Sequence, residues 1–124
     1  MIVDTSVLLA IHFGESQAPW AVQQMQKHMG LLSMSTVNLT ETLIRLKDRQ
    51  PVRFAELEGR LLNSGIRFVA PDVEQARIAA EARLRFPLNL GDCFVYALAK
   101  VERKAILTLD NDFRCLDVAV LLPP

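Results

Sequence analysis

The sequence predicts an α/β fold, a three-layer α/β/α sandwich in which helices cover both faces of a short parallel sheet. Short apolar runs typical of buried strands alternate along the 124 residues with longer stretches of helical periodicity. Strands that alternate with helices favour a parallel sheet, because a parallel connection needs a crossover that is usually a helix. Several of the apolar runs are followed at once by acidic or hydroxyl side chains, which suggests a site where the strands end.

The length and composition restrict the class of protein. A chain of 124 residues has room for one core, so residues 1–124 are expected to form a single domain. The formal net charge is zero, so no overall basic field indicates nucleic acid, although a local patch could still bind it. No apolar run approaches the roughly 18 residues of a membrane helix, and no signal peptide is recognisable at the start. We therefore expect a cytoplasmic protein without membrane contact.

Two strands and four helices are expected in the first half of the chain. The first apolar run ends in Asp4, and Gly14 interrupts the helical pattern that follows. Gly30 ends an amphipathic stretch, Ser35 helps to open the next helix, and Pro51 is tolerated in the first turn of another. The expected elements are a strand at 1–3, helices at 7–13 and 16–29, a strand at 31–34, and helices at 37–48 and 50–63.

Three strands and two helices are expected in the second half. Gly65 closes the preceding helix, and Asp72 is a suitable N-cap for a helix that stops before Pro87. The helix that opens at Gly91 and Asp92 is apolar almost all round, which places it in the middle of the domain. The expected elements are a strand at 66–70, a helix at 73–86, a helix from residue 92, and strands at 106–109 and 117–122.

Carboxylates accompany several of these elements at one edge of the predicted sheet. Asp4 follows the first strand and Asp110 follows the strand at 106–109, so both are expected at the carboxyl ends of parallel strands, where ligands gather. Asp92 opens the buried helix, and Glu41 lies one turn into a helix that follows the second strand. We therefore expect these four side chains to converge.

A cluster of partly buried carboxylates is costly unless a cation lies among them. Left alone, the four charges would repel one another and raise their own pKa values. Mg²⁺ or Mn²⁺ would turn this repulsion into coordination, since hard divalent cations prefer oxygen ligands. Two such ions suit the attack of water on a phosphodiester. Ser6 and Thr108 are candidates for orienting a carboxylate or a water from just outside the ligand set.

Each acidic residue also has a simpler structural explanation. Asp4 could only cap the helix that follows it, Asp92 could only complement a helix dipole, and Glu41 could lie on a solvated face. Residues 110–112 resemble a turn, which favours a turn role for at least one of the two aspartates there. The coincidence of the four positions favours a site over separate structural roles.

These motifs together resemble the PIN domain, and in particular the toxin ribonucleases of VapBC-type toxin–antitoxin modules. The matching stretches are Ile2–Ser6, Thr40–Glu41, Leu90–Ala99 and Ile106–Phe113, which follow the family's order and spacing over nearly the whole chain. The resemblance implies a PIN-like fold and a metal-dependent endoribonuclease toxin that acts on RNA, often tRNA or rRNA. It also implies a homodimer and a cognate antitoxin that holds the activity in check.

The resemblance also assigns the acidic residues. Asp4, Glu41 and Asp92 match the family's acidic ligands, and the family places a late aspartate at the position of either Asp110 or Asp112. We favour Asp110, which is nearer to the strand end, and keep Asp112 as support. The implied catalytic residues are Asp4, Glu41, Asp92 and Asp110, and the implied ligands of Mg²⁺ or Mn²⁺ are Asp4, Asp92, Asp110 and Asp112.

Basic residues cluster in the helical pair that follows Glu41. The candidates for RNA contact are Arg45, Lys47 and Arg49, for which an ordinary solvated helix surface is the simpler explanation. The functional alternative is a phosphate-contacting rim beside the acidic pocket. The early helices could equally form a groove that binds an antitoxin helix.

Other functions remain as alternatives or are excluded by single positions. A haloacid dehalogenase-type hydrolase needs a second aspartate where this chain has Ser6, and a receiver domain needs a lysine after its late strand, where Lys104 instead precedes it. A non-catalytic PIN-like module that binds RNA or protein remains open, as does a housekeeping RNA-processing nuclease.

Overall fold

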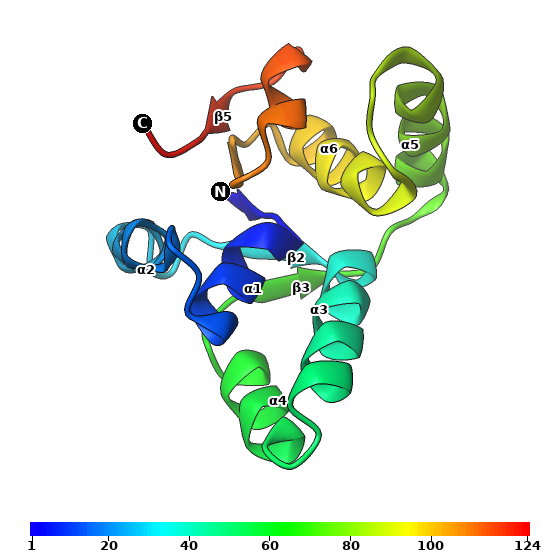
Figure 1. The fold of residues 1–124 in the computed structure, drawn as a ribbon. Helices are drawn as coiled ribbons and strands as arrows, with labels where there is room; N and C mark the ends of the chain where they lie inside the picture. The colour runs from blue at the N-terminus through cyan, green and yellow to red at the C-terminus, as the bar shows by residue number, and fades with distance from the viewer.

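The computed structural model describes all residues, 1–124, and shows a five-stranded parallel sheet between two sets of helices (Figure 1). The strands lie in the order β3-β2-β1-β4-β5. They are β1 (Ile2–Val3), β2 (Ser33–Ser35), β3 (Arg67–Val69), β4 (Ile106–Leu107) and β5 (Val120–Leu121). The helices are α1 (Thr5–Phe13), α2 (Ala18–Lys27), α3 (Thr36–Arg49), α4 (Phe54–Leu62), α5 (Val73–Arg85), α6 (Leu90–Glu102) and the 3₁₀ helix η1 (Asn111–Cys115). The predicted three-layer α/β/α class is confirmed.

The alternation of side chains along the central strands produces the layers. β1 and β4 pair in register, with Ile2 opposite Ile106 and Val3 opposite Leu107. Val3 and Leu107 pack into a core cluster with side chains of α1, α2, α3 and α4. Ile2 and Ile106 pack into a second cluster with α6 and with Phe113 of η1. Because successive strand residues point to opposite faces, two apolar residues in a row are enough to hold a helical layer on each side.

Local sequence determines where the helices begin and end. Gly14 adopts a left-handed conformation, with φ of 63°, and ends α1. The Ser35 hydroxyl accepts a hydrogen bond from the Val37 backbone N–H and caps α3, and the Asp72 carboxylate accepts from Gln75 and caps α5. No helix of the structure is long and apolar enough to cross a membrane.

The observed elements differ from the expected ones mainly at their ends. α4 begins at Phe54 and not at residue 50, because the Arg53 backbone N–H donates to the Gln50 carbonyl at 3.2 Å and closes a turn with Pro51 at its second position. The strands are also shorter than expected. β4 stops at Leu107, which leaves residues 108–110 free to bend into the candidate site.

Core packing of α6 can be tested by shortening a single side chain. Leu98 of α6 is fully buried, whereas Leu84 of α5 is 90% exposed. Leu98→Ala should lower the free energy of unfolding by about 2–5 kcal/mol, because it removes buried apolar surface and leaves a cavity. Leu84→Ala should change it by less than about 0.5 kcal/mol. Urea unfolding followed by circular dichroism measures both, and equal losses would contradict the central position of α6.

Candidate active site

Asp4 lies at the carboxyl end of β1 and is 3% exposed. Although it occupies the N-cap position of α1, its side chain makes no capping hydrogen bond. Instead, Asp4 Oδ2 accepts hydrogen bonds from Ser6 Oγ at 2.6 Å and from Thr108 Oγ1 at 2.8 Å. Helix capping therefore does not explain Asp4, and its Oδ1 atom has no hydrogen-bond partner within the protein.

The two hydroxyls are themselves oriented by the loop after β4. The Leu109 backbone N–H donates to Ser6 Oγ, and the Asp110 backbone N–H donates to Thr108 Oγ1, both at 3.0 Å. Each hydroxyl accepts from the backbone and donates to Asp4, so its hydrogen is directed toward the carboxylate. These bonds bring the end of β1, the start of α1 and residues 108–110 to one place.

Glu41 of α3 is held by two side chains that the sequence motifs did not single out. Its Oε1 atom accepts from Asn38 Nδ2 at 2.9 Å and from Thr5 Oγ1 at 3.1 Å. Asn38 precedes Glu41 by three residues and so shares its helix face. That spacing was the only sequence signal for Asn38, and Thr5 was indicated only as a member of the Ile2–Ser6 stretch.

Asp92 lies in the first turn of α6 and forms a capping box with Asn89. The Asp92 backbone N–H donates to Asn89 Oδ1 at 2.8 Å, and the Asn89 backbone N–H donates to Asp92 Oδ2 at 3.2 Å. Asp92 thus has a capping role that adds to the helix-dipole role expected from the sequence. The same position also brings Asp92 close enough to Asp4 for the Asp4 charge to raise the pKa of Asp92.

The two late aspartates have different surroundings. Asp110 is partly buried, and its Oδ1 atom accepts from the Asp112 backbone N–H at 2.8 Å, which caps η1. The negative charge of Asp110 contributes to raising the pKa of both Asp4 and Asp92. Asp112 is exposed in the first turn of η1 and makes no such contribution. The charge of Asp110 therefore acts on Asp4 and Asp92, whereas Asp112 has no such effect.

Burial and mutual repulsion make these acids hard to ionise. Burial raises the pKa of Asp4, and the charges of Asp110 and Glu41 raise it further against the hydrogen bonds from Ser6 and Thr108. Burial, followed by the charge of Asp4, raises the pKa of Asp92 to about 7. A shift in this direction on two neighbouring acids is typical of a functional site.

The donor set fits a divalent metal ion. All candidate ligands are carboxylate oxygens, as hard cations such as Mg²⁺ prefer, and Asp4 presents a free oxygen while its other oxygen is fixed. A bound cation would also relieve the repulsion that raises the pKa of Asp92. In this structure no three acidic, histidine or cysteine side chains are close enough to hold one ion between them. One carboxylate oxygen of Asp92 accepts a hydrogen bond from the Asn89 backbone N–H, and one of Asp110 accepts from the Asp112 backbone N–H.

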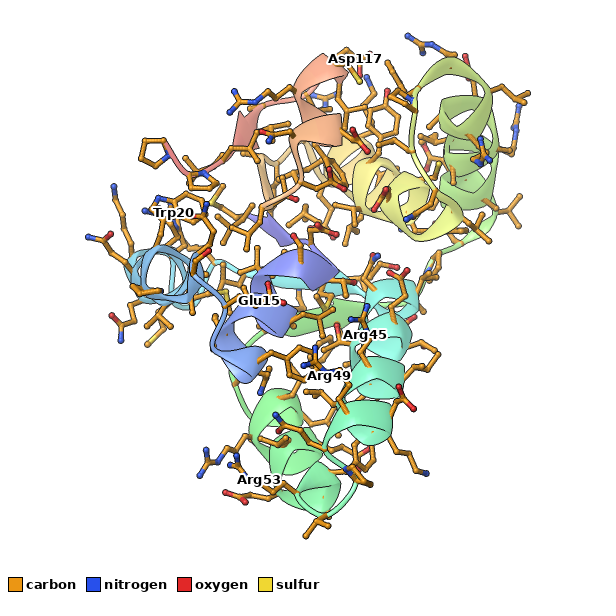
Figure 2. The ribbon with its side chains drawn as sticks, in the orientation of Figure 1. Glu15, Trp20, Arg45, Arg49, Arg53 and Asp117 are labelled. Carbon is orange, nitrogen blue, oxygen red and sulfur yellow. The ribbon has the colours of Figure 1, made fainter.

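The three basic candidates are not equivalent. Arg45 lines a hollow of about 240 Å³ beside Glu41, together with Thr5, Leu9 and Ile44. The Arg49 guanidinium lies 4.1 Å from the centroid of the Phe13 ring, and Lys47 Nζ lies 5.5 Å from that of Phe54 in α4. Figure 2 shows Arg45 and Arg49 between α3 and α1, with Arg53 lower down near α4. Of the three candidates, Arg45 is the one that lines a hollow with an acidic site residue.

Comparison with known proteins gives consistent matches along the chain. A family model described as the PIN domain matches residues 1–119. Ribonuclease VapC42 of Mycobacterium tuberculosis is 35% identical over an alignment of 127 positions that covers 95% of this chain and 96% of the relative. Ribonuclease VapC of Mycolicibacterium smegmatis is 35% identical over an alignment of 133 positions that covers 98% of this chain and 99% of the relative.

Solved structures match the same fold. VapC20 of Mycobacterium tuberculosis, described as a toxin that cleaves the sarcin–ricin loop, superposes with a TM-score of 0.84 at 20% identity and covers 98% of both chains. A chain of a toxin–antitoxin complex from Klebsiella pneumoniae superposes with a TM-score of 0.81 at 20% identity, covering 99% of this chain and 97% of that one. At these identities the match concerns the fold.

The raised pKa of Asp92 predicts how stability depends on pH when no metal is bound. A free aspartate has a pKa of about 3.9, so between that value and about 7 the folded state holds a proton that the unfolded state has released. The stability that Asp92 contributes is therefore complete below about pH 4 and is lost as pH rises through 7. Asp92→Asn should remove this loss, since an amide oxygen can still accept from Asn89.

Thermal melts in chelator at pH 4.5 and pH 8 measure this effect. The melting temperature of Asp92→Asn relative to wild type should be higher at pH 8 than at pH 4.5. The exposed Asp48→Asn on α3 serves as the matched control and should show no such difference. The same relative stability of Asp92→Asn at both pH values would contradict the electrostatic account.

Proposed function

The chain belongs to the PIN domain family, and from this premise we propose that it is a metal-dependent endoribonuclease, the toxin of a type II toxin–antitoxin pair. Both relatives named above are ribonucleases of the VapC group, at 35% identity over nearly full length. The observation that carries the proposal is the buried Asp4 carboxylate, fixed through one oxygen and open through the other. It lies at the sheet edge, where the charges of Asp110 and Glu41 raise its pKa and its own charge raises the pKa of Asp92.

In this proposal the acidic residues divide into metal ligands and a base. Asp4, Asp92 and Asp110 would hold Mg²⁺ or Mn²⁺ once the Asp92 and Asp110 carboxylates turn from the backbone N–H groups that they now contact, and Asp112 would add negative charge at the rim. When bound, the ion supplies Lewis-acid stabilisation at the phosphate and lowers the pKa of a coordinated water. Glu41 Oε2, which has no hydrogen-bond partner in the protein, accepts a proton from the attacking water, while its Oε1 stays engaged.

The neighbouring residues keep these groups in place and contact the substrate. Ser6 and Thr108 hold Asp4 in one orientation, which leaves Oδ1 directed away from its two donors. Arg45, at the hollow beside Glu41, contacts a phosphate next to the one that is cleaved. The substrate class is RNA, with tRNA or rRNA as the candidates.

Partners follow from the relatives and structural neighbours. Several matching structures are toxin–antitoxin complexes, including DNA-bound VapBC of Salmonella typhimurium, with a TM-score of 0.76. We propose that this chain likewise has a cognate antitoxin and forms a homodimer. The VapC names of the relatives favour a toxin over a housekeeping nuclease, and the four acids present favour catalysis over a non-catalytic binding module.

Removal of a ligand charge should abolish cleavage without unfolding the protein. Asp4→Asn and Asp92→Asn should each lower the rate of RNA cleavage by about 100-fold or more, because metal-ion stabilisation is several kcal/mol and 1.4 kcal/mol is tenfold. Asp48→Asn is the control and should retain the wild-type rate. Cleavage of total RNA, with Mg²⁺ or with chelator, measures the effect. Wild-type rates in either ligand variant would contradict the proposed site.

Arg45 should affect substrate binding more than the chemical step. Arg45→Ala should raise KM and reduce the slope of log KM against log salt by about 1, because one phosphate contact is lost. kcat should change little. Lys27→Ala, at the exposed end of α2, is the control. Steady-state cleavage from 50 to 200 mM salt gives both quantities, and an unchanged KM in Arg45→Ala would exclude a phosphate contact there.

A further inference from the structure

Asn38 joins two helices that carry acidic site residues. It is 1% exposed, and its single amide nitrogen donates to Glu41 Oε1 of its own helix at 2.9 Å and to the Gly91 carbonyl of α6 at 3.0 Å. Both hydrogens of Nδ2 are thus engaged. Gly91 directly precedes Asp92, so Asn38 connects the Glu41 carboxylate with the backbone just before Asp92.

The orientation of the Asn38 amide follows from its acceptors. With the amide reversed, its oxygen would face a carboxylate oxygen and a carbonyl oxygen, and neither could donate. In the observed orientation, Asn38 Oδ1 is buried without a hydrogen-bond partner. A buried unpaired oxygen is unfavourable. The Asn38 side chain therefore donates to Glu41 and Gly91, while its own amide oxygen, Oδ1, stays without a hydrogen bond.

Gly91 is constrained by the same carboxylate. It is buried in the first turn of α6, and a Cβ at this position would lie 2.5 Å from both Oε1 and the carboxyl carbon of Glu41. Real Cβ atoms essentially never come that close to another heavy atom, so the Glu41 carboxylate would have to move. Such a movement is costly here because Asn38 and Thr5 hold the carboxylate by hydrogen bonds. The Glu41 carboxylate thus lies against the α-carbon of Gly91, in space that any other residue would fill.

We propose that Asn38, Thr5 and Gly91 form a positioning device for Glu41, an inference that rests on the proposed ribonuclease function. Asn38 and Thr5 hold Glu41 Oε1 from one side, and Gly91 leaves room for the carboxylate beside the turn that carries Asp92. The bond from Asn38 to the Gly91 carbonyl sets the spacing between α3 and α6. Asn38 acts through Glu41 and does not touch the substrate.

The first test separates positioning from a structural role of Asn38. Asn38→Asp keeps the size of the side chain but removes both donors, and Asn38→Ser is a second variant in case the aspartate does not fold. kcat should fall about 10–100-fold, as for other residues that orient ligands from outside, with KM within about twofold. Thr42→Val is the matched control, because Thr42 is buried on the same helix and its hydroxyl bonds only the Asn38 carbonyl.

A double-mutant cycle tests the Gly91 contact without any activity or metal. Alanine is a better helix former than glycine, so Gly91→Ala should raise the melting temperature in a Glu41→Ala background. In the presence of Glu41, Gly91→Ala should instead lower the melting temperature by about 4 °C or more, because the added methyl group displaces the Glu41 carboxylate. The melts are performed in chelator, so that bound metal does not contribute.

The outcomes distinguish the two proposals. A reversed sign in the cycle, together with a kcat loss in folded Asn38 variants that Thr42→Val does not share, supports the positioning device. A Gly91→Ala effect of the same sign and size in both backgrounds overturns it, as does wild-type kcat in Asn38→Asp. If the wild-type protein cleaves no RNA with Mg²⁺ or Mn²⁺, the proposed function fails, whereas the cycle still reports on the contact.

Discussion

Asp4 is a carboxylate buried at the end of a central strand, and it therefore needs hydrogen-bond donors nearby. The neighbouring parts of the site supply them. Two hydroxyls, from Ser6 at the start of α1 and Thr108 after β4, donate to one Asp4 carboxylate oxygen. Both hydroxyls accept in turn from the backbone of residues 109 and 110. The loop that carries Asp110 is therefore tied to the strand that carries Asp4, and the geometry of the edge depends on a few short bonds.

The other two acids are placed by helices that pack against each other. α3 and α6 are in contact, and the Asn38 amide links them where Glu41 and the turn before Asp92 meet. α6 is buried along most of its length, so its first turn has little freedom to move and can hold a charged group near others. Burial, followed by repulsion from Asp4, raises the pKa of Asp92 to about 7. A divalent cation would relieve the repulsion.

The sequence was sufficient for the fold class, and it places Asp4 and Asp110 after strands and Asp92 in the first turn of a helix, because these elements have clear apolar patterns. Element ends were less predictable: Pro51 suits a first helical turn as well as the turn that the structure shows. The roles of Thr5, Asn38 and Gly91 depend on contacts with residues 36, 53 and 50 positions away, respectively. No local pattern encodes such contacts, apart from the three-residue spacing of Asn38 and Glu41.

We propose that the acids at the carboxyl edge of the sheet hold a divalent cation. Anomalous diffraction from crystals grown with Mn²⁺ tests it most directly, since the ion can be located without reference to activity. We expect an anomalous peak between Asp4 and Asp92, with Asp110 nearer to it than Asp112. A structure at saturating Mn²⁺ with no peak at this edge, or with the ion bound elsewhere, would contradict it.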